Sequence, residues 1–132
     1  MLQVKQNMIL VVTSLLSILL VTLHVSDDIV RGYEPGGFKH IQTILTMALW
    51  LYGTLALAGR RSGYVLMLLG ALLGCLVSLA HMRGAGYVGG RVAHTDGMLL
   101  WVFSQLTLGV TASVSVFLAA QGLWSLRRGQ RR

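Results

Sequence analysis

Four long apolar segments, separated by short polar connections, dominate this chain of 132 residues. A transmembrane helix needs about 20 predominantly apolar residues, within a range of roughly 17–25. Because lipid offers the backbone no hydrogen-bond partners, each segment is predicted to be a helix. The predicted helices cover residues 8–30, 41–58, 64–82 and 97–124, and residues 8–25 are the apolar part of the first.

The connections between these segments predict how the helices run. The middle connection, from Gly59 to Gly63, is very short, so the second and third helices should form an antiparallel hairpin. The other two connections are longer and rich in glycine. We therefore predict an all-α, integral membrane four-helix bundle with up-down-up-down topology, forming a single domain over residues 1–132.

The composition agrees with a membrane location. Only 11% of the residues are charged, whereas a soluble domain carries about 25%. The net charge of +7 could suggest nucleic-acid binding, but the basic residues flank apolar spans and form no aromatic-interleaved patch. We therefore expect no nucleic-acid partner. Cys75 is the only cysteine, which excludes an intrachain disulfide and favours a small buried thiol.

The basic residues also predict the orientation. Seven lie on the side of the two termini, namely Lys5, Arg60, Arg61, Arg127, Arg128, Arg131 and Arg132. Four lie on the other side, together with all four acidic residues. The positive-inside rule then places both termini in the cytoplasm, with the chain in a bacterial inner membrane and its basic tail against anionic headgroups.

Small and polar residues mark the inward faces of the helices. Gly70, Gly74 and Ser78 recur every four residues, a spacing that lets a neighbouring helix approach closely, and His81 continues this face. In the first helix, Thr13, Ser17 and His24 follow one side, and Ser104, Thr111 and Ser115 do so in the fourth. These hydroxyls favour helix packing over a polar pathway. Trp50 is expected to pack inside, and Trp101 and Trp124 to act as interfacial anchors.

The candidate chemistry gathers at the predicted outer end of the bundle. In a continuous first helix, His24 meets Asp27 at i+3 and Asp28 at i+4. His81 ends the third helix at a similar depth, and His94 precedes the fourth. Imidazoles and carboxylates in one cavity suit a divalent transition metal such as zinc. These five residues are the candidate metal ligands, with His40 and Asp96 as weaker ones.

Two other interpretations of these residues stay open. Asp27 and Asp28 could pair with Arg31 or Arg83, and Asp96 or Thr95 could cap the fourth helix. Haem between His24 and His81 is not expected, because the nearby carboxylates suit it poorly. The spacing matches no diagnostic metal motif.

Three functions remain compatible with the sequence. The first is a non-enzymatic accessory or interaction subunit, either self-associating or part of a larger membrane-protein complex, because the loops are short and no soluble domain is present. The second is a metal-binding protein or metal-dependent membrane enzyme. The third is a passive oligomeric channel. A proton-coupled transporter is disfavoured, since no ionisable residue lies near the middle of a span.

Overall fold

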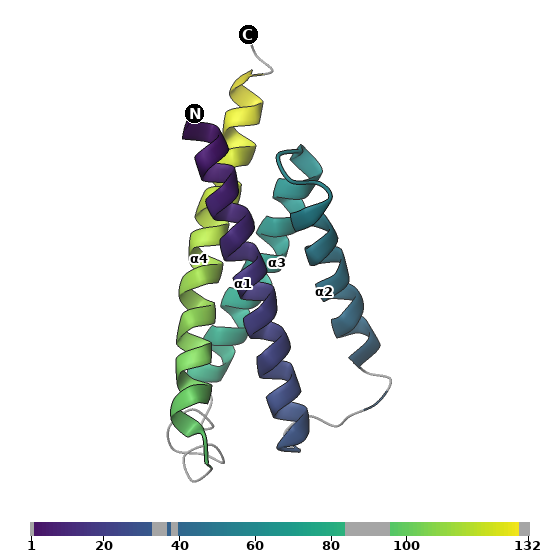
Figure 1. Ribbon diagram of the computed structural model, residues 1–132, viewed down its shortest axis with the longest axis vertical. Helices are drawn as coiled ribbons and strands as arrows, with labels where there is room; N and C mark the ends of the chain where they lie inside the picture. The colour runs from purple at the N-terminus through teal and green to yellow at the C-terminus, as the bar shows by residue number, and fades with distance from the viewer. Residues whose placement is uncertain (1, 33–36, 38–39, 84–95, 130–132) are drawn as a thin grey trace.

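Four α-helices, without strands, make up the computed structural model, which describes residues 2–32, 37, 40–83 and 96–129. Consecutive helices run in opposite directions, and both chain ends lie at the same end of the bundle (Figure 1). The all-α prediction is confirmed. The helices are α1 (Leu2–Val30), α2 (His40–Leu55), α3 (Arg61–Arg83) and α4 (Met98–Gly129).

Three of these helices are long and apolar enough to cross a membrane. Their candidate spans are Val4–Val30, Arg61–His81 and Met98–Gly129. A membrane location is therefore supported by the structure. The helices α1 and α4 are longer than predicted, because each continues through polar residues at the end where the termini lie.

The second helix is shorter than predicted. It ends at Leu55 rather than residue 58 and has 16 residues, which corresponds to a length of about 24 Å. The hydrocarbon core is about 30 Å thick. A turn follows α2, in which Gly59 has a φ of 78° that favours glycine. The amide of Arg60 donates to the carbonyl of Leu57 within this turn.

Close helix packing through small residues is confirmed. The most extensive contacts join α3 to α4 and α1 to α4. A Cβ atom on Gly70 would collide with the indole ring of Trp50, and one on Gly74 would lie 3.2 Å from the Cβ of Ala112. Trp50 is buried as expected. Glycine at these two positions therefore lets α3 approach α2 and α4.

Hydroxyl groups bind α1 to α4 through the middle of the bundle. The Ser17 and Thr111 hydroxyls share a hydrogen bond of 3.0 Å, and Ser115 donates to Thr13 Oγ1 over 2.9 Å. Several of the same hydroxyls also contact carbonyl groups one turn earlier. The expected role in helix packing is confirmed. The two pairs also define the antiparallel register of α1 and α4.

Candidate metal centre

Three side chains that could bind a metal ion converge at the end of the bundle opposite the start of α1 and the end of α4. They are His24 near the end of α1, Asp28 one turn later, and His81 near the end of α3. Their candidate ligand atoms all lie within 4.8 Å of one another. Among the described residues, this is the group of histidine and acidic side chains with a geometry compatible with a metal ion.

His24 and Asp28 face each other because α1 continues past Val25. Residues four apart lie on one face of a helix, and the His24 Nε2 atom lies 3.2 Å from Asp28 Oδ2. Only 3% of His24 and 7% of Asp28 are exposed. The second ring nitrogen of His24, Nδ1, is buried and has no hydrogen-bond partner among the described residues. This ring is therefore fixed at one nitrogen and unsatisfied at the other.

His81 presents a defined nitrogen to the same carboxylate. Its Nδ1 lies 2.8 Å from the carbonyl oxygen of Val77. Since a carbonyl can only accept, Nδ1 carries the proton and donates it. The other ring nitrogen, Nε2, faces the Asp28 carboxylate and could bind a metal ion when it carries no proton. This Nε2 lies 3.8 Å from Asp28 Oδ2.

Trp101 closes the group from α4, and its prediction as an interfacial anchor was wrong. It is 5% exposed, and its ring centroid lies 5.7 Å from that of His24 and 5.6 Å from that of His81. Its Nε1 donates to Asp28 Oδ1 over 3.4 Å. The indole therefore covers the two imidazoles and contacts the carboxylate.

The remaining predicted residues lie elsewhere. Asp27 Oδ2 lies 2.7 Å from Arg31 Nε, so Asp27 has the arginine partner that the alternative interpretation proposed. Arg31 also donates through Nη1 to the backbone carbonyl of Asp96, whose side chain is exposed. His40 begins α2 and is not in the group. His94 lies outside the described residues.

The separations within the group can be compared with metal coordination. In a tetrahedral zinc site, ligand atoms lie about 2.1 Å from the ion and therefore about 3.4 Å from one another. The His24–Asp28 separation of 3.2 Å already matches this value, and the Asp28–His81 separation of 3.8 Å is slightly larger. All three ligand atoms lie within 4.8 Å of one another, so the two histidine side chains would approach each other on binding an ion. Two imidazoles and one carboxylate leave a fourth position open.

Gln105 is a further polar residue that the sequence analysis did not select. Its side chain is fully buried, and neither its Nε2 nor its Oε1 has a hydrogen-bond partner among the described residues. The only signal in the sequence is its place on a stripe of α4 at helical spacing. That stripe of buried residues consists of Trp101, Gln105, Leu108, Ala112, Ser115, Ala119 and Gly122.

The register of α1 and α4 places Gln105 at the level of His24. Deeper in the bundle, Ser17 pairs with Thr111, and at the mouth Asp28 pairs with Trp101. One helical turn further into the bundle than Asp28 is His24 on α1, and one turn further than Trp101 is Gln105 on α4. The unpartnered Nδ1 of His24 and the unpartnered amide of Gln105 therefore lie at one depth, on the inward faces of two helices in contact.

Comparison with known proteins adds no further constraint on function. No protein-family model matches the chain, and no curated protein or solved structure shows significant similarity to it. The described residues form an all-helical protein with membrane-length helices and a His–Asp–His group in which His24 and Asp28 are buried and His81 is half-buried. The function must be argued from this geometry.

Proposed function

We propose that this protein is a metal-binding integral membrane protein that holds one divalent transition metal ion, such as zinc, through His24, Asp28 and His81. The observation that carries the proposal is the convergence of three metal-ligand atoms from two helices within 4.8 Å. An ionised carboxylate removed from water needs compensation by a charged or hydrogen-bonding partner. A divalent cation would supply that compensation for Asp28, and the two imidazoles would complete its coordination.

The second nitrogen of each ring supports this assignment. Histidines that bind metals through one nitrogen usually donate the other N–H to a carbonyl or carboxylate, which fixes the ring. His81 makes such a bond to Val77. For His24, Oε1 of Gln105 is the acceptor that we propose, because it is at the same depth and has no hydrogen-bond partner among the described residues. A neutral His24 ring that held a metal through Nε2 would carry its proton on Nδ1, and Gln105 Oε1 could then accept it.

The donor set indicates what the bound ion could do. Three protein ligands leave the fourth position of a tetrahedral zinc ion open to water. A zinc-bound water loses a proton near neutral pH and supplies hydroxide, so the site suits a metal-dependent hydrolytic enzyme. His94 stays a predicted additional ligand. If His94 occupied the fourth position, the coordination shell would be complete, and the site would have a structural role instead of a catalytic one.

The proposed setting is the bacterial inner membrane, with both termini in the cytoplasm and four crossings. The seven-to-four distribution of basic residues supports this orientation. The short α2 would complete the fourth crossing by local thinning of the bilayer or by interfacial flanking residues. The metal centre would then lie at the outer end, accessible from the periplasmic side.

Elemental analysis of the protein purified in detergent tests the proposal. The wild type should retain about one metal ion per chain, as expected for a single site with this donor set. The variants His24→Ala, His81→Ala and Asp28→Asn should lose it. Asp27→Asn is the matched control, because Asp27 is the neighbouring carboxylate and pairs with Arg31. Absence of stoichiometric metal from the wild type, or equal loss in Asp27→Asn, would contradict the proposal.

An accessory or interaction subunit is the second candidate function. A largely apolar groove of about 460 Å³ lies between α3 and α4, and Cys75, Gly109 and Ser113 are among its lining residues. Gly109 and Ser113 have the four-residue spacing at which small residues permit close helix contact. Crosslinking in native membranes from Val110, which lines this groove, tests for a second copy or another membrane protein. A stable monomer without crosslinked products would contradict this function.

The channel hypothesis receives less support from the geometry. The hydroxyls that would line a pathway, Thr13, Ser17, Thr111 and Ser115, are hydrogen-bonded across the α1–α4 contact. A pore between copies would therefore need other lining residues. Liposome flux that is insensitive to substitutions at these four positions would count against a pathway through this contact.

A further inference from the structure

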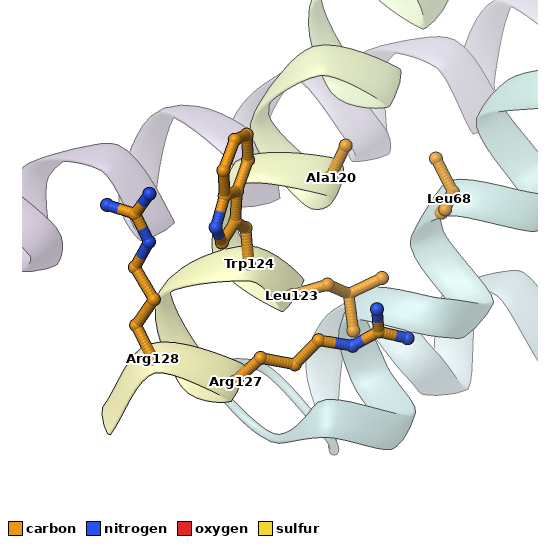
Figure 2. A pocket seen from close by; sticks show the side chains of 6 residues that line it. All are labelled: Leu68, Ala120, Leu123, Trp124, Arg127 and Arg128. Atoms are coloured by element: carbon orange, nitrogen blue, oxygen red, sulfur yellow. The ribbon is translucent and has the colours of Figure 1, made fainter. Parts of the chain in front are cut away.

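A groove with basic residues beside it lies at the opposite end of the bundle from the metal centre. It occupies about 550 Å³ on the α3 and α4 side, near the end of the chain. Its lining residues are Leu68, Ala120, Leu123, Trp124, Arg127 and Arg128. Figure 2 shows the Arg127 side chain extending past Leu123, and the Arg128 side chain on the other side of Trp124. The groove therefore combines apolar and aromatic side chains with two cationic ones.

The two arginines take different positions around Trp124. The guanidinium carbon of Arg128 lies 4.8 Å from the centroid of the indole ring, a cation–π geometry. Arg127 extends on the other side, toward Leu123 (Figure 2). Both side chains are exposed, and within the described helices neither forms a salt bridge. Two positive charges are thus held beside an apolar surface without a compensating carboxylate.

The composition of this end of the protein leaves those charges uncompensated. The acidic residues that the structure describes, Asp27, Asp28 and Asp96, belong to the other end. Trp124 is 61% exposed at the end of a membrane-length helix, the position where tryptophan lies at headgroup level. An occupant of this groove must therefore be anionic where it meets the arginines and apolar where it meets Leu68.

We infer that this groove binds one anionic phospholipid. Its phosphate would lie beside the Arg127 guanidinium, which extends toward Leu123, since guanidinium groups form charge-assisted hydrogen bonds to phosphate oxygens. Arg128, on the other side of Trp124, would add a second positive charge at headgroup level. One acyl chain would follow Leu123, Ala120 and Leu68 into the bilayer. The inference rests on the membrane location of the helices and is independent of the metal centre.

Quenching of tryptophan fluorescence by brominated lipids tests the inference in the full-length protein. The protein is reconstituted in phosphatidylcholine vesicles that contain an equal fraction of either brominated phosphatidylglycerol or brominated phosphatidylcholine. The Trp124 signal is the difference between the wild type and Trp124→Phe. We expect stronger quenching of this signal by the anionic lipid, because each arginine near a membrane surface favours anionic headgroups about fivefold.

Three variants separate a defined site from diffuse attraction. The double variant Arg127→Gln/Arg128→Gln should be quenched equally by both lipids. The double variant Arg60→Gln/Arg61→Gln removes the same charge from the same membrane side and should keep the preference. Ala120→Phe fills the groove without changing the charge and should reduce quenching by the anionic lipid. Equal quenching of wild-type Trp124 by both lipids, or loss of the preference in the Arg60/Arg61 variant, would overturn the inference.

Discussion

Replacing Gln105 with methionine should stabilise the metal-free protein and weaken metal binding. The side chain is fully buried, and both of its amide atoms lack hydrogen-bond partners within the described helices. A buried polar group without a partner costs about 1–3 kcal/mol. Methionine has a similar length and shape without polar atoms, and volume-conserving exchanges in a core cost less than about 1.5 kcal/mol. We expect Gln105→Met to raise the free energy of unfolding of the metal-free protein by about 1–3 kcal/mol.

The effect on zinc binding should have the opposite sign. If Gln105 orients His24, its loss should weaken zinc binding about 10–100-fold, as for other residues that position metal ligands. At a free zinc concentration of 100 times the wild-type Kd, zinc stabilises the wild type by about 2.7 kcal/mol. The same concentration should stabilise the variant by only about 0.4–1.4 kcal/mol.

Thermal unfolding in detergent, with and without free zinc, measures both effects. Leu108→Met is the matched control, because Leu108 is the next fully buried residue on the same stripe of α4. It should change stability little and leave zinc stabilisation unchanged. A metal-free Gln105→Met protein that is less stable than the wild type would refute the claim that the amide is unsatisfied. A stabilised variant with unchanged zinc affinity would refute the role assigned to Gln105 beside His24.

Four further predictions follow from the same geometry. Asp28→Asn should abolish metal retention, which elemental analysis measures. Asp27→Asn should retain the metal and change the free energy of unfolding by no more than about 1 kcal/mol, as for exposed ion pairs; thermal unfolding measures this change. Gly70→Ala should destabilise the bundle by about 1–3 kcal/mol in thermal unfolding, because the added Cβ would collide with the Trp50 ring. Gly129→Ala is the control and should leave the stability unchanged, because nothing lies within 4 Å of its added Cβ. Lowering the pH from 7.5 to 5 should release the ion, since metal-binding imidazoles must be neutral; equilibrium dialysis with zinc checks this, and retention at pH 5 would contradict it. Alkaline phosphatase fused to the C-terminus should be inactive and a green fluorescent protein fusion fluorescent, and the reverse result would contradict the proposed orientation.

Part of the metal centre could be predicted from the sequence because it depends on helical periodicity. His24 and Asp28 are four residues apart, so any helix that continues past Val25 brings them to one face. His81 followed from its position on the face of Gly74 and Ser78, which packs against α4. Periodicity within one helix was sufficient in both cases.

The contributions of α4 could not be predicted in the same way. Trp101 lies one turn from the start of its helix, where tryptophan commonly anchors at the interface, and only the approach of α1 and α3 buries it. Gln105 has no feature in the sequence that distinguishes it from an ordinary polar residue of a helix. Its place at the level of His24 follows only from the register of α1 with α4. The end of α2 also depended on a local turn, since Gly59 adopts a positive φ that composition does not reveal.

The unsatisfied atoms favour a functional interpretation of the site over a structural one. A buried ionic or polar group is seldom retained for stability, because well-packed apolar residues of similar volume are often equally or more stabilising. In the part of the chain that the structure describes, three such atoms, His24 Nδ1 and the two amide atoms of Gln105, have no hydrogen-bond partner and belong to one level of the bundle. A purely structural role for His24 would be met by its contact with Asp28 alone and would not require a second polar residue at the depth of its other nitrogen. A metal ion at Nε2 gives that second residue a use, because the coordinated ring must then donate from Nδ1 to a fixed acceptor.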